Sequence, residues 1–202
     1  MRIIGLTGGI ATGKSTVSNY LSTQHNIPVL DADVYAKEAV VKDSPILQEI
    51  FQYFGKHLKL QDGTLNRAAL GDIVFTNPEA KQWLESKIHP FVRDRFKQEL
   101  AKINSDTVVL AIPLLFEANL THLVTEIWVV YCDRQTQLTR LQKRNNLTEK
   151  QASDRINSQL PLKEKVARAD FVLDNNSTLE YLYEQCDVGL QKSFLKQIKD
   201  RL

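Results

Sequence analysis

The chain has 202 residues, of which 43% are apolar and 25% charged, and its net charge is +2. This composition is typical of one soluble α/β domain, and so small a charge gives no reason to expect a nucleic-acid or membrane partner. Neither a transmembrane run nor a signal-peptide pattern is found, and the two cysteines form no CxxC or Cys/His cluster. We therefore expect a cytoplasmic protein without a disulfide framework or a zinc site.

The first segment predicts a strand, a glycine-rich loop and a helix in direct succession. Residues 2–6 form a short apolar run, which is typical of a buried strand. The sequence GGIATGKS at 8–15 then fits G-x-x-x-x-G-K-[ST] at every fixed position. Apolar residues at 17, 20 and 21 indicate a helix that ends near residue 25. This order is the context in which the motif is a phosphate-binding loop.

Each residue type in this loop has a chemical purpose. Glycines let successive backbone N–H groups turn toward one anion, and the positive end of the helix dipole points the same way. Lys14 is placed to reach the β- and γ-phosphates, and the Ser15 hydroxyl to ligate Mg²⁺. We therefore predict binding of a nucleoside triphosphate with Mg²⁺. The expected loop residues are Gly8, Gly9, Ala11, Thr12, Gly13, Lys14, Ser15 and Thr16.

A second short strand is predicted at 27–30, and two acids, Asp31 and Asp33, follow it. In an open α/β sheet, ligands bind at the carboxyl ends of the strands, so both acids are expected on the functional edge. A helix through 34–40 comes next. The spacing leaves open which acid faces the site, and N-capping of that helix is the alternative purpose.

Residues 44–104 predict helices without a buried strand. Helical spacing runs over 46–54 and stops at Gly55, a turn is expected at 62–63, and a further helix is closed at 77–78. A long amphipathic pattern covers 79–103, with a kink or break expected at His89-Pro90. We interpret this block as an acceptor-binding insertion. Arg67, His89 and Arg93 are candidates to meet an anionic substrate, with ordinary surface positions as the alternative.

Two apolar runs, 107–112 and 127–131, indicate central parallel strands. Glu117 lies just beyond the first of them, where it is suited to hold a hydroxyl or the water shell of a cation, or to cap a helix. The residues themselves do not decide among these.

The next region predicts an arginine-bearing helical hairpin. Helix 134–146 carries Arg140 and Arg144 on one face, and Thr148 with Gln151 indicates the start of a second helix, which carries Arg155 and ends at 160–161. Such a hairpin is typical of the lid that closes over ATP in small phosphotransferases, with a solvated arginine face as the alternative. A last strand is expected at 171–173, followed by Asn175 on the functional edge and a helix from 179 to 202.

Taken in order, these segments resemble the dephospho-coenzyme A kinase family over nearly the whole chain. The resemblance is carried by LTGGIATGKST, DAD at 31–33, FG at 54–55, DGTLNR at 62–67, HP at 89–90, PLLFE at 113–117, QLTRLQKR at 137–144 and ADFVLDNN at 169–176. It implies an α/β P-loop kinase with a five-stranded parallel sheet. The implied parts are a nucleotide core at 1–40, 105–135 and 165–202, a helical CoA-binding insertion at 41–104 and a lid at 136–164.

The resemblance also implies a reaction and residue roles. ATP, with Mg²⁺, would phosphorylate the ribose 3′-hydroxyl of dephospho-CoA, and a monomer is expected. Asp33 matches the acid that accepts the hydroxyl proton, Arg140 the lid arginine near the phosphates, and Asn175 a residue bordering adenine. Lys14 and Ser15 keep the roles given above, while Arg67, His89 and Glu117 fall on positions that line the substrate site.

Two positions depart from the family pattern. Ala11 stands where a second loop glycine is usual, which a small side chain tolerates if its φ is negative. Lys37 stands where many members have arginine. If that side chain binds a phosphate through two hydrogen bonds, lysine is the weaker ligand.

Two other functions remain open from the residues. A nucleoside monophosphate kinase also has a phosphate loop and a lid that closes over ATP, but it uses a nucleotide as acceptor. A nucleotide-dependent switch needs no acceptor, but N-K-x-D and D-x-x-G motifs are missing.

Overall fold

The computed structural model describes the backbone of residues 1–199 and the side chains of residues 1–192. Its internal contacts divide the chain into two compact units. The first, here called the sheet unit, comprises Met1–Leu30 and the chain from Asn104 onward. The second, the helical unit, is Asp31–Ile103. Each has a hydrophobic core of its own, so each is described by itself.

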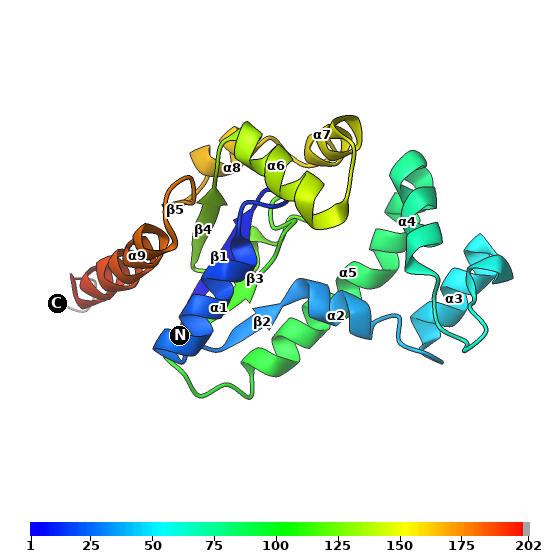
Figure 1. The fold of residues 1–202 in the computed structure, drawn as a ribbon. Helices are drawn as coiled ribbons and strands as arrows, with labels where there is room; N and C mark the ends of the chain where they lie inside the picture. Colours follow the sequence, from blue (N-terminus) through cyan, green and yellow to red (C-terminus); the bar gives the residue numbers. More distant parts are fainter. Residues whose placement is uncertain (200–202) are drawn as a thin grey trace. The chain divides into compact units, whose positions relative to one another are not determined.

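The sheet unit contains most of a five-stranded sheet in the order β2-β3-β1-β4-β5 (Figure 1). The strands are β1 (Arg2–Gly8), β2 (Val29–Asp31), β3 (Thr107–Ala111), β4 (Glu126–Tyr131) and β5 (Phe171–Asp174). β1 pairs in parallel with both β3 and β4, and β4 pairs in parallel with β5. The predicted α/β class with a central parallel sheet is therefore confirmed. Because β1 is central, the loop that follows it opens in the middle of the sheet's carboxyl edge.

The helices of the sheet unit are α1 (Lys14–His25), η2 (Thr121–Leu123), α6 (Arg134–Asn145), α7 (Glu149–Asn157), α8 (Leu162–Ala167) and α9 (Leu179–Lys199). The predicted capping box is present: the Thr148 hydroxyl accepts from Gln151 N, and the Gln151 side chain accepts from Thr148 N. The helix predicted to end at 160–161 stops at Asn157, and α8 follows as a separate helix. Residues 200–202, which the predicted last helix included, lie outside the described residues.

The core of the sheet unit fills the space between the sheet and the helices α1 and α9. Its fully buried members include Leu6 of β1, Leu21 of α1, Trp128 of β4 and Leu182 of α9. At the amino end of β1, the buried Arg2 guanidinium pairs with Glu126 and donates to the carbonyl oxygens of Gly189 and Leu190. This packing anchors the strand that leads into the glycine loop.

The helical unit consists of α2 (Ala32–Glu38), α3 (Pro45–Phe54), η1 (Lys56–Leu58), α4 (Arg67–Thr76) and α5 (Pro78–Leu100). Leu47 and Ile50 of α3, Leu58 of η1 and Leu70 of α4 form the centre of its core. Tyr35 of α2 meets Phe96 of α5 edge to face, with ring centroids 5.3 Å apart. Contacts of this kind place residues 31–40 with the helical unit. The predicted three-part division, with its nucleotide core reaching residue 40, stays a prediction.

Of the kink or break expected at His89-Pro90, the break is wrong, and the kink stays a prediction. α5 runs as one helix of 23 residues with Pro90 inside it. Proline removes one helical hydrogen bond and costs about 3 kcal/mol in a helix interior. The buried Val92 and Phe96 on one side of Pro90, and Leu84 and Ile88 on the other, pack into the unit and offset that cost.

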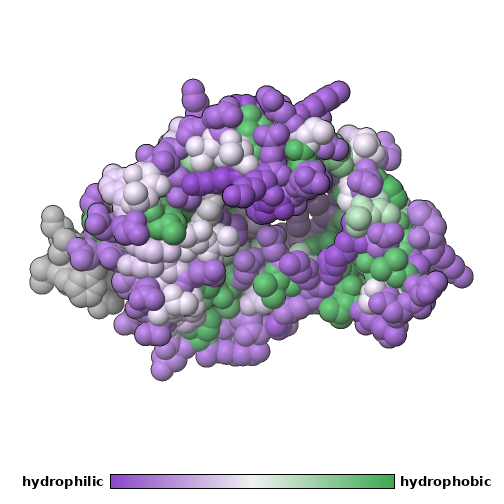
Figure 2. Space-filling model, viewed as in Figure 1, coloured by the Kyte–Doolittle hydropathy of each residue, from purple (hydrophilic) through white to green (hydrophobic). Residues whose placement is uncertain are grey.

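The face on view in Figure 2 is mostly hydrophilic, with hydrophobic residues showing in separate areas. Within residues 1–199, no helix combines the length and the apolar character that crossing a bilayer requires.

Candidate active site

The glycine loop connects β1 to α1 as predicted. Gly13 forms the N-cap of α1 with φ of 103°, and the N–H groups of Thr16 and Val17 donate to its carbonyl at 3.0 and 3.3 Å. A Cβ at Gly13 would lie 2.2 Å from the Asn175 amide nitrogen, so both the backbone angle and the space demand glycine. The first N–H groups of the helix remain outside its own hydrogen-bond ladder and open into the loop, which is how helices bind phosphate.

Side chains within the sheet unit support the loop from inside. Thr12 is fully buried, and its hydroxyl donates to the Gly9 carbonyl at 2.9 Å. The buried Asn175 amide donates to the Thr12 carbonyl at 2.7 Å. The structure thus gives Asn175 a contact with the loop backbone, while its predicted place beside adenine stays a prediction.

Ala11 does not have the negative φ expected from the sequence for a small side chain at this position. Its φ is +61°, in the left-handed region that favours glycine. The reason is local: the chain must reverse between β1 and α1 within a few residues, and position 11 takes part of that turn. The loop of this protein therefore contains a strained alanine at a position whose backbone angles favour glycine.

Replacing Ala11 with glycine is expected to stabilise the protein. Relief of the left-handed strain outweighs the extra chain entropy of glycine and the lost methyl contact, and we expect the free energy of unfolding to rise by about 1 kcal/mol. Urea denaturation of the two proteins measures the difference. A lower midpoint in the glycine variant would show that the alanine methyl contributes more than its backbone strain costs.

Arg140 on α6 contacts Asn175, the residue whose amide holds Thr12 of the loop. Its Nη2 donates to the Asn175 carbonyl at 3.1 Å. Its Nη1 is buried and has no hydrogen-bond partner within the part of the chain that the structure describes. A buried guanidinium nitrogen without an acceptor is costly, and a phosphate oxygen is the acceptor it fits best. The residues present thus suit an anionic nucleotide.

Cys132 directly follows β4, and its thiol lies near Arg140. Burial raises the pKa of this thiol to about 11; the Arg140 cation lowers it by a smaller amount, and the Asp133 carboxylate raises it slightly further. It is therefore protonated at neutral pH and unsuited to act as a nucleophile.

Lys14 and Ser15 occupy the first two positions of α1. Lys14 is half-buried and Ser15 exposed. Among the described residues there is no group of three or more His, Cys, Asp or Glu side chains that could hold a metal ion. The assignments of Lys14 to the phosphates and of Ser15 to Mg²⁺ stay predictions.

The helical unit contains a cavity of about 330 Å³. Its polar lining consists of Asp33 and Lys37 of α2 with Arg67 of α4. Arg67 Nη2 donates to the Lys37 backbone carbonyl at 3.3 Å, which ties the Arg67 guanidinium to α2. The remaining walls are formed by Ala36, Val40, Leu65, Leu70, Gly71, Val74, Leu84 and Ile88. The cavity suits a ligand that has both an anionic and an apolar part.

The two acids at the carboxyl end of β2, Asp31 within the strand and Asp33 after it, have different positions in the structure. The Asp31 carboxylate accepts from Asp33 N at 2.8 Å and caps α2. Asp33 lines the cavity of the helical unit. The capping purpose that the sequence left open therefore belongs to Asp31.

His89 is not among the residues that line this cavity. It is half-buried on α5, and burial lowers its pKa below the usual 6.5, helped by Arg93 and Lys81 and opposed by Glu85. Its predicted contact with substrate stays a prediction, as does that of Arg93, which is exposed.

The lowered pKa of His89 predicts a pH effect on stability. The unfolded chain takes up a proton near pH 6.5 before the folded one does, so this residue makes stability fall as the pH drops through that range. His89→Gln is expected to lose less thermal stability than wild type between pH 8 and pH 5.5. Melting temperatures of both proteins at the two pH values measure this, and identical losses would contradict the prediction.

Glu117, predicted to line the substrate site, has two partners in the sheet unit. Its Oε1 lies 2.8 Å from Lys165 Nζ and accepts from Leu160 N at 3.1 Å. Lys165 is fully buried, and sequence reasoning missed it because α8 itself was not predicted. Whether Glu117 also contacts substrate stays a prediction.

A glycine loop between the central strand and the first helix of a five-stranded parallel sheet defines a P-loop nucleotide-binding protein of the small-kinase class. Comparison with known proteins narrows this class. The model of the dephospho-CoA kinase family matches residues 2–180. The chain belongs to the dephospho-CoA kinase family.

Individual relatives agree with this assignment. A dephospho-CoA kinase from Trichormus variabilis is 58% identical over 189 residues, which is 94% of this chain and 96% of the relative. A crystal structure of a Thermus thermophilus protein superposes with a TM-score of 0.82 at 34% identity, covering 95% of this chain and 97% of the other. The structure of dephospho-CoA kinase from Campylobacter jejuni superposes with a TM-score of 0.67 at 30% identity, covering 95% of this chain and 97% of the other.

Proposed function

We propose that this protein transfers the γ-phosphoryl group of ATP to the ribose 3′-hydroxyl of dephospho-CoA, giving CoA and ADP. The observation that carries the proposal is the phosphate loop formed between β1 and α1 in a chain of the dephospho-CoA kinase family. Family membership favours this acceptor over the nucleotide used by a nucleoside monophosphate kinase.

The donor half of the reaction belongs to the sheet unit. The N–H groups at the start of α1 bind the phosphates, with Lys14 placed on the β- and γ-phosphoryl oxygens. Arg140 offers its unpartnered Nη1 to the same group. Ser15 would hold Mg²⁺ beside the phosphates, where the ion would supply further neutralisation of charge. Phosphoryl transfer depends mainly on such positioning and charge compensation.

The acceptor half belongs to the helical unit. Lys37 and Arg67 suit the pyrophosphate of dephospho-CoA, and the aliphatic walls of the cavity suit its pantetheine arm. Asp33 accepts the proton of the 3′-hydroxyl. At the same time the hydroxyl oxygen bonds to the γ-phosphorus and ADP leaves. In this role Asp33 also orients the hydroxyl in line with the leaving oxygen.

We also propose a monomer located in the cytoplasm. Both cysteines, Cys132 and Cys186, are free and buried, as is usual for proteins of a reducing compartment. Size-exclusion chromatography with light scattering measures the oligomeric state.

Coupled release of ADP from ATP and Mg²⁺, with and without dephospho-CoA, tests the proposed reaction. We expect release that depends on dephospho-CoA, and no comparable release with AMP, CMP or UMP as acceptor. A nucleoside monophosphate that replaced dephospho-CoA would identify a nucleotide kinase instead. ADP release independent of any acceptor would identify a hydrolytic switch and contradict the proposal.

A further inference from the structure

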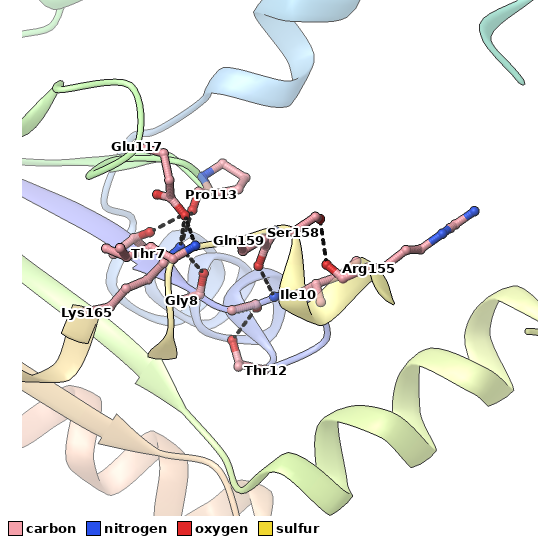
Figure 3. A network of polar contacts seen from close by, with 12 residues as sticks. Thr7, Gly8, Ile10, Thr12, Pro113, Glu117, Arg155, Ser158, Gln159 and Lys165 are labelled. Carbon is pink, nitrogen blue, oxygen red and sulfur yellow. Dashed lines mark hydrogen bonds and ion pairs between the residues drawn. The ribbon is translucent and has the colours of Figure 1, made fainter. Parts of the chain in front are cut away.

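Lys165 of α8 is fully buried, and its side chain ends in a polar cluster at the base of the phosphate loop (Figure 3). Its partner Glu117 lies at the edge of this cluster, with 23% of its side chain exposed. The Lys165 ammonium nitrogen lies 2.8 Å from Glu117 Oε1, 3.3 Å from the Pro113 carbonyl oxygen and 3.4 Å from the Gly8 carbonyl oxygen. A lysine ammonium has three donor hydrogens, and the cluster provides three acceptors. The buried charge is therefore fully compensated within the sheet unit.

The partners of Lys165 are themselves held in place. Glu117 Oε1 also accepts from Leu160 N at 3.1 Å, and the buried Thr7 hydroxyl donates to the Pro113 carbonyl at 3.1 Å. The cluster thus links three segments: the end of β1, the turn after β3 and the segment between α7 and α8. Of the atoms joined here, the Gly8 carbonyl is the one that belongs to the phosphate loop.

Two glutamines hold the loop two residues further on. Ile10 N donates to Gln159 Oε1 at 2.8 Å, and the Ile10 carbonyl accepts from Gln137 Nε2 at 2.9 Å. Gln137 is buried, so its amide is a fixed partner and not a surface contact. Both polar backbone groups of Ile10 are therefore occupied by side chains from α6 and from the segment after α7.

These contacts divide the loop into two halves. The first half, at Gly8 and Ile10, has backbone groups bonded to protein side chains, of which Lys165 and Gln137 are buried. The second half, at Gly13 and the start of α1, presents the N–H groups that suit a phosphate. The two halves are only a few residues apart. The orientation of the N–H groups at Gly13 and the start of α1 therefore depends on the side-chain contacts that fix Gly8 and Ile10.

We propose that Lys165 is a positioning residue for nucleotide binding. Through the Gly8 carbonyl, and with Glu117 as its counter-ion and the two glutamines beside it, Lys165 sets the course of the loop. It touches neither nucleotide nor acceptor. The inference rests on the proposed function only in taking the loop as the ATP site.

The test uses Lys165→Met, which keeps the apolar stem and removes the charge, together with the double variant Lys165→Met/Glu117→Gln. Lys150→Met, at an exposed lysine of α7, is the control. Fluorescence titration with a labelled ADP gives the Kd for nucleotide, steady-state rates give KM for ATP and for dephospho-CoA, and thermal melting gives stability.

We expect Lys165→Met to weaken ADP binding and raise KM for ATP about tenfold, while KM for dephospho-CoA changes by less than about twofold. The single variant also melts at a lower temperature, because Glu117 loses its counter-ion. The double variant regains most of that stability but not the nucleotide affinity, since the Gly8 carbonyl still lacks its donor. Lys150→Met behaves as wild type.

Wild-type ADP affinity in the double variant would overturn the proposal. So would equal changes in both KM values that follow the loss of stability, because they indicate a structural role alone. If the wild-type protein binds ADP but does not phosphorylate dephospho-CoA, the proposed function fails while the ADP titration still tests Lys165.

Discussion

Replacing Lys14 with alanine is expected to lower phosphoryl transfer by a factor of about a hundred to a thousand or more. Lys14 is the first residue of α1 and follows directly on Gly13 in the phosphate loop. Its ammonium compensates charge that grows on the transferred group, and water replaces it poorly within the loop. Because Lys14 is partly exposed and lies outside the hydrophobic core, the fold should survive the change.

Acceptor-dependent ADP release measures the loss of phosphoryl transfer, and circular dichroism measures whether the fold survives. Lys150→Ala, which removes an exposed lysine from α7, is the control and should leave both unchanged. Retained transfer in the Lys14 variant would mean that the loop does not bind the reacting phosphates through this residue.

Changing Asp33 to asparagine is expected to reduce kcat by a factor of about a hundred to ten thousand, the range typical of a lost general base. Asparagine keeps the size of the side chain but cannot take the proton of the acceptor hydroxyl. ATP affinity should be unchanged, since the donor site is formed by residues of the sheet unit. Single-turnover kinetics with saturating ATP separate these two effects.

Asp31→Asn is the matched control for Asp33. Asp31 caps α2, and asparagine is as good an N-cap as aspartate, so near wild-type turnover is expected. If instead Asp33→Asn turned over at the wild-type rate and Asp31→Asn did not, the roles assigned to the two acids would have to be exchanged.

Local signals in the sequence predicted the elements whose cause is itself local. The loop at Gly8–Ser15 follows an apolar strand and opens a helix, so its position needed no tertiary information. The capping box at Thr148 and Gln151 is also a matter of spacing alone. The end of α3 was equally readable, because Gly55 takes a φ of 104° that other residues rarely adopt.

Predictions were wrong or incomplete where a distant contact outweighs a local preference. Pro90 disfavours a helix, yet α5 passes through it because residues on both sides pack into the helical unit. α8 is a helix of six residues, too short to leave a periodic pattern in the sequence. Neither outcome can be derived from neighbouring residues.

The sequence by itself determined the class of this protein and its phosphate loop, because glycine spacing, a lysine and a hydroxyl suffice for that chemistry. Only the tertiary structure decided which acid caps α2 and which lines a cavity, since Asp31 and Asp33 look alike in the sequence. It also showed the strain at Ala11 and the partners of Lys165, which come from segments far apart along the chain. Such contacts arise from the packing of strands and helices, and no spacing rule encodes them.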